Sequence, residues 1–379
     1  MISFELSEEQ RQLVDTAHKF AENEIRPAAA KFDASGEFPY EILKMAWETG
    51  LMGENVPVEN GGMGLGCFES VLIAEELYWG CAGIGTSAVC NALALGPIVI
   101  AGTPEQKERF LRPFTEQFKI ASFALTEPAS GSDVATMRTT YKKDGEGFLL
   151  NGSKQWITNA GYADLMTVFA SADTAKGAKA ISAFVIDAKA PGVVVGKKEH
   201  KLGQCASDTR AVTFENVRIP KQDLLGAEGE GFKIAMRNLD KSRPGIGAAA
   251  VGLARSALEH SIRYAKERAT FGKPLAEHQG IQFMIADMAK DIQASRLLCW
   301  QAAWLSDQKK PNHKESAYAK CFASDTAMQV TTDAIQIFGG YGYSKEYPVE
   351  KLFRDAKLIQ IYEGANQIQR MVIAKHLLK

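Results

Sequence analysis

Glu363 is the residue whose surroundings in the sequence most favour catalysis. It lies in the segment 361–370, IYEGANQIQR, behind an isoleucine and a tyrosine and directly before Gly364. A carboxyl group placed there can point into an apolar cavity, where burial disfavours its charged form and raises its pKa from about 4.3 toward neutrality. Such a group suits general-base chemistry. From this segment alone, an ordinary solvated glutamate before a helix is the alternative interpretation.

A second group of residues suits a planar ligand that is rich in hydrogen-bond acceptors. The block 123–133, FALTEPASGSD, offers backbone amides, small hydroxyl side chains and a glycine that allows close approach. Trp156, Ile157 and Thr158 then place a flat apolar plate beside a hydroxyl, which suits a planar heterocycle. Each motif alone has an ordinary explanation, because Thr-Glu-Pro is a common turn and Trp156 can be a core residue.

In a third group of residues, a charged or amide side chain lies close in the sequence to glycine. The segment 268–279 begins with Arg268, which can clamp a pyrophosphate. Gln336 lies shortly before Gly339 and Gly340, which let a ligand approach the backbone. The two glycines can instead end the preceding helix as a cap, but this interpretation leaves Gln336 without a role.

The sequence argues against several other kinds of site. It contains no P-loop, no His-Glu-x-x-His and no Gly-x-Ser-x-Gly elbow, and its six histidines are dispersed. Its six cysteines form no Cys-x-x-Cys pair and have no histidine at zinc spacing, which indicates reduced thiols and no metal site. Gly245 starts a Gly-x-Gly-x-x-Ala match, but no strand precedes it, so we expect close helix packing or the approach of a ligand there. The kind of site that these observations leave open is one for a cofactor bound outside these motifs.

Composition and charge are those of a soluble globular protein. The 379 residues are 46% hydrophobic and 23% charged, and the length suggests two to three domains. The net charge of -1 gives no support for nucleic-acid binding. Residues 1–10 lack the basic and apolar regions of a secretion signal, and we find no segment long and apolar enough to span a bilayer. We expect a cytoplasmic protein without membrane insertion, although a mature organellar protein has the same appearance.

The elements that must position these residues change type along the chain. Ser7 and Gln10 form a capping box before the first helix, and helical patterns recur as far as about residue 100. We therefore predict an N-terminal α-helical domain over residues 1–120. From Ala121 the pattern becomes short β-branched or aromatic runs separated by Asn-Gly, Asp-Gly and Pro-Gly turns, which predicts an antiparallel β domain over residues 121–230.

The helical period returns at about Gly231 and continues to the end of the chain. One apolar face is marked by Ile281, Ile285, Met288, Ile292 and Cys299. Long helices with few breaks predict a four-helix-bundle domain over residues 231–379. The fold class is therefore α+β, mostly α, and the absence of a low-complexity linker predicts that the three domains pack as one unit.

In this order, the motifs resemble those of the acyl-CoA dehydrogenase family, most of all its short- and medium-chain type. The similarity extends over essentially all of the chain and is carried by segments 123–133, 155–159, 203–210, 239–244, 268–279, 336–340, 347–357 and 361–370. The resemblance implies a helical domain, a β-barrel-like domain and a four-helix domain, in that order. It also implies FAD bound without a Rossmann fold, and a homotetramer built as a dimer of dimers.

The resemblance assigns cofactor contacts residue by residue. Those near the flavin ring are Phe123, Leu125, Thr126, Ser132, Trp156, Ile157 and Thr158, with Trp156 over its face and Thr158 near N5. Those that hold the pyrophosphate and adenosine, some of them across a subunit interface, are Arg268, Phe271, Gln279, Gln336, Gly339 and Gly340. The family's Thr-Ser-Gln is matched by Ala365, Asn366 and Gln367, so the threonine hydroxyl is missing here.

The resemblance also implies where the substrate binds and what happens to it. The acyl-CoA is expected beside Ser132, Asp240, Arg243 and Gly364, although Arg243 can equally be an ion-pair partner of Asp240. Glu363 would take the α-proton of the thioester while flavin N5 takes the β-hydride, which yields a 2-enoyl-CoA. A backbone N–H and a flavin ribityl hydroxyl would hold the thioester oxygen.

Some relatives carry the base at the position of Ser242, and serine cannot serve as that carboxylate, which favours Glu363. The implied electron acceptor is electron-transferring flavoprotein. The alternatives are an acyl-CoA oxidase that uses oxygen, which typically has an extra C-terminal domain, and a catalytically silent acyl-CoA-binding flavoprotein. The acyl group stays open: Val89 predicts an uncharged pocket, and Asn91 either contacts the acyl group or packs between helices.

Overall fold

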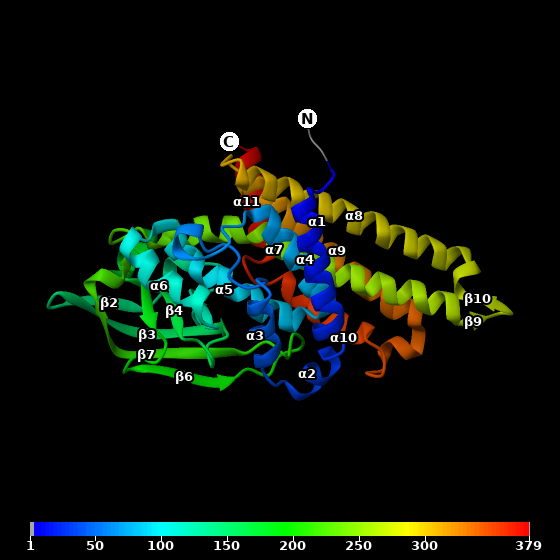
Figure 1. Cartoon of the computed structure of the whole chain (residues 1–379), viewed down its shortest axis with the longest axis horizontal. Coiled ribbons are helices and arrows are strands. Elements are labelled where there is room, and N and C mark those ends of the chain that lie inside the picture. The colour runs from blue at the N-terminus through cyan, green and yellow to red at the C-terminus, as the bar shows by residue number, and fades with distance from the viewer. Residues whose placement is uncertain (1–3, 379) are drawn as a thin grey trace.

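Most strands gather at one end of the molecule and long helices extend to the other end (Figure 1). The computed structural model describes residues 4–378, so residues 1–3 of the N-terminal segment 1–10 lie outside the described residues. The long helices are α7 (Gly231–Glu267), α8 (Gln279–Asp307) and α9 (His313–Phe338). The predicted class, α+β and mostly α, is confirmed. The domain boundaries at 120/121 and 230/231 stay a prediction.

The first part of the chain is helical, as predicted. Helix α1 begins with a capping box in which Gln10 N donates to Ser7 Oγ and Ser7 N donates to Gln10 Oε1. The helices are α1 (Glu8–Phe20), a π-helical turn (Ala21–Ile25), α2 (Ala29–Ser35), α3 (Tyr40–Glu48), α4 (Cys67–Gly80), α5 (Ala82–Ala101) and α6 (Pro104–Glu116). Helices α4 and α5 are largely buried, which explains why neither shows a clear polar face.

Helix α5 corrects one expectation from the sequence. Its 20 residues are long and apolar enough to cross a membrane by length and composition, contrary to the prediction that no segment is. Most of this apolar stretch is buried inside the protein. The helix packs against α7 and against strand β1 (Ala121–Ala124), so its composition is that of a core helix.

The first eight strands form one mixed sheet. The other strands are β2 (Thr140–Asp144), β3 (Gly147–Thr158), β4 (Leu165–Ser171), β5 (Ile181–Asp187), β6 (Val193–Lys198), β7 (Thr209–Pro220) and β8 (Leu224–Leu225). They lie in the order β6-β7-β3-β2-β4-β5-β8, and β1 pairs with β4 off this path. Most pairs are antiparallel as predicted, but β4 pairs in parallel with β1 and with β2. All seven residues of β4 are buried, which fits a strand covered on both faces.

Helix α7 connects the sheet to the helical end of the molecule (Figure 1). It packs against β5, α4, α8 and α9. A short hairpin of β9 (Ala269–Thr270) and β10 (Lys273–Pro274) joins it to α8, and α10 (Val349–Ile359) and α11 (Asn366–Leu377) follow α9. Because one continuous helix touches both parts, the sheet and the bundle are held in a fixed relation.

Glycines on α7 allow its neighbours to approach closely. A Cβ at Gly247 would lie 2.6 Å from Cys299 Sγ, and one at Gly252 would collide with the carbonyl oxygen of Glu75 in α4. The Gly-x-Gly-x-x-Ala match therefore lies inside a helix, where Gly247 serves close packing as expected. Gly245 differs, because a Cβ there would meet no atom within 4 Å.

We expect Gly252→Ala to destabilise the protein, because α4 and α7 must move apart to admit the methyl group. The free energy of unfolding should fall by about 1–3 kcal/mol. The matched control is Gly280→Ala in α8, where an added Cβ meets nothing within 4 Å. That variant should change stability by less than about 1 kcal/mol. Chemical denaturation of both proteins tests this, and equal effects would contradict the packing argument.

Candidate active site

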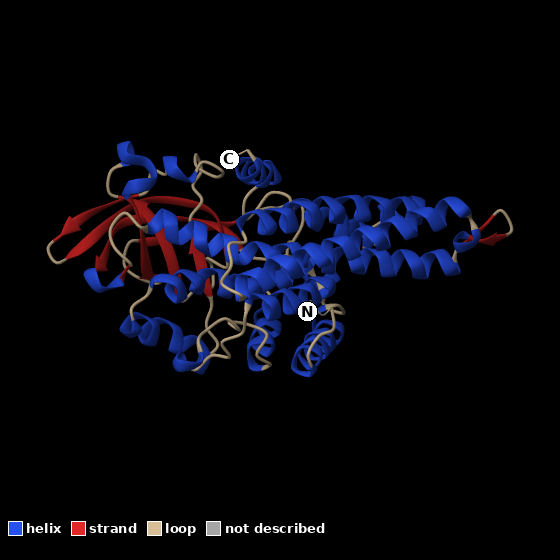
Figure 2. Ribbon diagram, turned by 90° about the horizontal axis from the view of Figure 1, so that it is seen from above, coloured by secondary structure: helices blue, strands red, loops and turns tan. Residues whose placement is uncertain are grey.

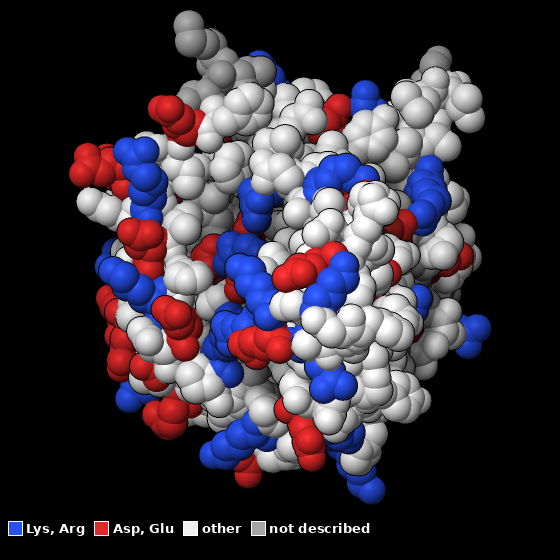
Figure 3. All heavy atoms as spheres, turned by 90° about the vertical axis from the view of Figure 1, so that its right-hand side faces the viewer, with Lys and Arg blue, Asp and Glu red and all other residues white. Residues whose placement is uncertain are grey.

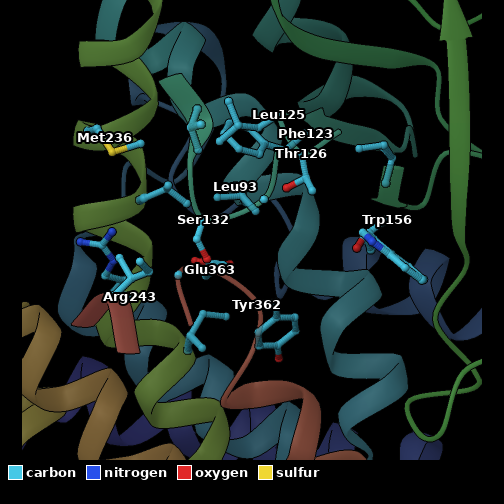
Figure 4. Close-up of a pocket in the computed structure, with 18 of the residues that line it drawn as sticks. Leu93, Phe123, Leu125, Thr126, Ser132, Trp156, Met236, Arg243, Tyr362 and Glu363 are labelled. Atoms are coloured by element: carbon cyan, nitrogen blue, oxygen red, sulfur yellow. The ribbon is translucent and has the colours of Figure 1, made fainter. Parts of the chain in front are cut away.

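Glu363 lies in the loop between α10 and α11, where the backbone takes an unusual form. The helix α10 ends as Ile361 N donates to the carbonyl of Leu358 at 2.8 Å. Glu363 then has φ +53° and Gly364 has φ +94°, both in the left-handed region that non-glycine residues rarely adopt. The predicted departure from the helix at Glu363 is therefore present. The turn directs the carboxyl group inward, towards Ser132 and Arg243 (Figure 4).

The carboxyl group of Glu363 is held by a hydrogen bond from α7. Ser242 Oγ donates to Glu363 Oε2, so the residue at the alternative base position contacts the predicted base directly. Burial raises the pKa of Glu363, against the hydrogen bond from Ser242 and the positive charges of Arg243 and Lys320, which lower it. The net rise makes this carboxylate a stronger base than one in water.

A cavity of about 300 Å³ opens in front of Glu363, and we call it the first cavity. All residues predicted near the flavin ring line it, namely Phe123, Leu125, Thr126, Ser132, Trp156, Ile157 and Thr158. The predicted substrate contacts Arg243 and Gly364 also line it. The structure therefore brings the ring contacts and Glu363 together around one cavity (Figure 4).

A buried lysine positions the block 123–133. Lys154 in β3 is fully buried, and its Nζ donates to the carbonyl of Leu125 at 3.0 Å and to Glu127 Oε1 at 2.8 Å. Burial lowers the pKa of Lys154 to about 8, although the nearby Glu127 carboxylate opposes this. Gln155 N also donates to the carbonyl of Thr126 at 2.9 Å. These bonds tie the block to β3, the strand that carries Trp156.

Trp156 is not a core residue. Its φ is +63°, the register of β3 against β7 shifts between Lys154 and Ile157, and its side chain is 56% exposed. The irregularity turns the indole out of the sheet, as β-bulges commonly do next to binding sites. An exposed indole fits the role of a flat surface against a planar ligand, and it does not fit the alternative that Trp156 is a core residue.

Arg243 takes part in the ion pair that was the alternative to a ligand role. Its Nη1 contacts Asp240 Oδ1, and Asp240 also contacts the ring of His313. The Nε of Arg243 is nevertheless buried without a hydrogen-bond partner among the described residues. A buried donor without a partner is costly. Arg243 itself lines the first cavity, so the ion pair with Asp240 and a contact with a ligand there are compatible. Asp240 does not line this cavity.

A second cavity of about 350 Å³ continues on the other side of Glu363. It runs between α4, α5 and α7, and it shares Val89, Leu93, Ile246 and Glu363 with the first cavity. Ser242, Gly245, Ser70 and Glu54 line its further parts. The two cavities thus meet at the carboxyl group.

The lining of the second cavity differs from expectation, because it includes charged residues such as Lys241 and Asp307. Val89 contributes an uncharged surface as predicted, but the buried carboxyl of Glu54 also lines it, and burial raises the pKa of that carboxyl. Asn91 does not line either cavity. Its side chain accepts from Ala121 N at 2.8 Å and donates to the carbonyl of Lys119 at 2.8 Å, so it has the packing role. No motif near Glu54 indicated its position.

The candidate contacts for the pyrophosphate and adenosine form a distal group at the far end of the bundle. Arg268, Gly339 and Gly340 line a separate surface pocket there, with the Arg268 guanidinium 5.8 Å from the centre of the Tyr341 ring. Phe271 in the hairpin turn is 97% exposed. Gln279 and Gln336 are also exposed. Figure 3 shows this end, where charges of both signs are interspersed among uncharged residues. A single chain does not bring this group to Glu363.

The triplet after Gly364 begins α11. Ala365 precedes the helix and makes no side-chain cap, in agreement with the missing hydroxyl. Asn366 is buried, and its amide donates to Asp325 Oδ1 at 2.7 Å and to Ser324 Oγ at 2.9 Å. Gln367 is exposed. Cofactor contacts by these three residues stay a prediction.

Sequence profiles of acyl-CoA dehydrogenase domains match nearly the whole chain. The N-terminal domain matches residues 7–117, the middle domain 122–217 and the C-terminal domain 229–378. The mitochondrial short-chain specific acyl-CoA dehydrogenase of Bos taurus is 48% identical over 378 residues, which cover 100% of this chain and 92% of the bovine protein.

Solved structures show the same relationship. Butyryl-CoA dehydrogenase from Megasphaera elsdenii is 42% identical, with a TM-score of 0.97 and 100% of both chains covered. A chain in a structure reported for the electron transferring flavoprotein of Acidaminococcus fermentans is 44% identical, with a TM-score of 0.97 and 100% of both chains covered. This protein therefore belongs to the acyl-CoA dehydrogenase family, a family of flavoprotein oxidoreductases.

Proposed function

We propose that this protein is a FAD-dependent dehydrogenase that converts a short-chain acyl-CoA into the 2-enoyl-CoA, a step of fatty acid β-oxidation. The observation that carries the proposal is the position of Glu363. Its carboxyl lies at the meeting point of two cavities, and the candidate flavin contacts line the first of them. This is where a base must be to reach a thioester α-carbon placed against a flavin.

The residues around the first cavity fit a flavin. Thr126, Ser132 and Thr158 bring hydroxyl groups, and the exposed indole of Trp156 offers a plate. When bound, FAD supplies the acceptor for the hydride that leaves the β-carbon. The distal group, with Arg268 and Phe271 foremost, would hold the pyrophosphate and adenosine of a cofactor bound to a neighbouring subunit.

Three side chains have distinct tasks in the proposed reaction. Glu363 takes the α-proton, and its burial makes the carboxylate basic enough to do so. Ser242 donates a hydrogen bond to one oxygen of this carboxylate and thereby orients the other oxygen towards the substrate. Because residue 242 is a serine, no second carboxylate competes as the base at that position. Arg243, which lines the first cavity, can donate from its guanidinium group to an oxygen of the acyl-CoA.

The names of two relatives support a substrate with a short acyl group. The bovine relative is named as specific for short chains, and the bacterial structure is that of a butyryl-CoA dehydrogenase. We propose that the acyl tail enters the second cavity, past Val89 and Leu93, while the flavin fills the first. The space beside Gly245 then lies along the path of a longer chain.

Partners follow from the same comparisons. We propose electron-transferring flavoprotein as the electron acceptor, because a chain in the structure reported for such a flavoprotein is 44% identical to this one. We also propose a homotetramer built as a dimer of dimers, since the exposed aromatic residues Phe271, Phe283 and Tyr343 would be covered in an assembly. Cytoplasmic localisation stays a prediction, and the bovine relative is mitochondrial.

The proposed reaction predicts that butyryl-CoA bleaches the bound flavin under anaerobic conditions. In Glu363→Gln the amide cannot accept the proton, so the rate of bleaching should fall by on the order of 10²–10⁴-fold or more. The variant should still bind FAD and perturb its spectrum on addition of butyryl-CoA. Stopped-flow absorbance measures both.

Each outcome of this experiment discriminates between functions. Wild-type protein that binds acyl-CoA without any bleaching would identify a silent binding protein. Reduced wild-type flavin that oxygen reoxidises as rapidly as electron-transferring flavoprotein does would favour the oxidase alternative. Near-normal bleaching of Glu363→Gln would place the base elsewhere.

The second cavity predicts how chain length is selected. Gly245→Leu should fill the space beside α7 and lower kcat/KM for hexanoyl-CoA by roughly tenfold or more relative to butyryl-CoA. Gly245→Ala is the matched control, because its Cβ meets nothing within 4 Å and should leave the ratio of the two substrates almost unchanged. Steady-state kinetics over acyl chains of increasing length measure the ratio, and an equal loss for all lengths would place the acyl tail outside this cavity.

A further inference from the structure

We infer that Lys320 is a positioning residue for the base: its ammonium group holds the loop that carries Glu363 and places a positive charge beside the Glu363 carboxylate. The inference rests on the proposed role of Glu363. Lys320 lies in α9, lines neither of the two cavities and belongs to none of the motifs on which the family resemblance rests.

The first argument is the pair of hydrogen bonds that Lys320 makes. The side chain is fully buried, and its Nζ donates to the carbonyl oxygen of Gly364 at 2.9 Å and to Asn366 Oδ1 at 2.9 Å. Both acceptors belong to the loop and helix start that directly follow Glu363. The ammonium therefore binds α9 to the residues that set the direction of the catalytic carboxyl.

The second argument is the backbone form that these bonds hold. Glu363 and Gly364 are both left-handed, and a non-glycine residue keeps such a form only where its surroundings impose it. The carbonyl of Gly364 is clamped from two sides, by Lys320 and by Gln369 Nε2 at 2.9 Å. Loss of either donor removes one of the two hydrogen bonds that hold the Gly364 carbonyl.

The third argument is that Lys320 differs from the other buried lysines of the described chain. Lys154 pairs with Glu127 and Lys351 pairs with Asp355. Lys320 forms no such ion pair within the residues that the structure describes, and its hydrogen-bond partners are uncharged oxygens. A buried ammonium without a paired carboxylate is costly, and its charge is left to act on Glu363 through space.

The charged and titratable groups around this pair come from four helices and the loop. Those facing Glu363 or Lys320 are Tyr78 in α4, Cys90 in α5, Arg243 in α7, Cys321 and Asp325 in α9, and Tyr362 in the loop. Arg243 is the other cation of this set, and it already contacts Asp240. Lys320 is thus the cation that no carboxylate contacts directly.

The sign of the effect follows from these charges. Burial raises the pKa of Glu363, and the positive charge of Lys320 lowers it. Burial lowers the pKa of Lys320 to about 8, so the ammonium is charged at neutral pH. With Lys320 present, more of Glu363 is ionised at neutral pH and ready to accept a proton. Without it, the same fraction is ionised only at higher pH.

The test uses the FAD-loaded full-length protein and anaerobic reduction by butyryl-CoA between pH 6 and 9. Lys320→Met should move the acid limb of the rate to higher pH and lower the rate at pH 6 by roughly tenfold or more. The deficit should shrink as pH rises, because Glu363 becomes ionised in both proteins. Lys320→Arg, which keeps the charge, should return the acid limb towards its wild-type position.

Gln369→Leu is the matched control. It removes the other donor to the Gly364 carbonyl but no charge, so it should lower the rate at all pH values and leave the acid limb where it is in wild type. Lys320→Gln keeps a neutral donor and should shift the acid limb as Lys320→Met does, which gives a second variant if methionine prevents folding.

Two results would overturn the inference. One is a wild-type acid limb in a folded, FAD-loaded Lys320→Met or Lys320→Gln. The other is an equal shift in Gln369→Leu, which would assign the effect to loop geometry alone. Failure of the wild-type protein to reduce its flavin is a separate result that removes the proposed function itself.

Discussion

The close fit of α7 against both the sheet and the other helices is the constraint on which the site depends. At its first residue, a Cβ on Gly231 would collide with the backbone of Ser182 in β5. Further along, Gly247 and Gly252 allow the helices of the bundle to approach. The stretch that faces Glu363 lies between these contacts. Because backbone meets backbone on both sides, the hydroxyl of Ser242 is carried on a rigid support rather than on a loop.

Buried charges then anchor the less regular segments to this frame. Lys154 holds the block beside the first cavity, and Lys320 holds the loop behind Glu363. Lys351 acts further away: it pairs with Asp355, which accepts from Gln204 N. Gln204 in turn is linked through two hydroxyl groups to the Tyr362 hydroxyl, one residue before the base. Satisfied networks of this kind specify a single arrangement of the loops that they connect.

The sequence predicted those features that depend on local pattern. The helices, most strands and the exit from the helix at Glu363 follow from periodicity and turn residues. The residues beside the first cavity were assigned by the family resemblance. Features set by long-range contacts were missed. Three examples join residues that are far apart in the chain. They are the parallel pairing of β4, the position of the buried Glu54 in the second cavity, and the contact of Ser242 with Glu363. Helix α5 shows a further limit, because apolar composition describes a protein core and a membrane span equally well.

The distance between the two sets of candidate cofactor contacts has a consequence for dilute solutions. Residues of β1 and β3 line the first cavity, and the distal group lies near the β9–β10 hairpin. The large sheet and this hairpin lie at opposite ends of the molecule (Figure 2). If one dinucleotide touches both sets, they must come from different chains, and each bound cofactor then links two protomers. Assembly and cofactor retention become one equilibrium, so dilution of the protein favours loss of cofactor even when the affinity of each separate contact is unchanged.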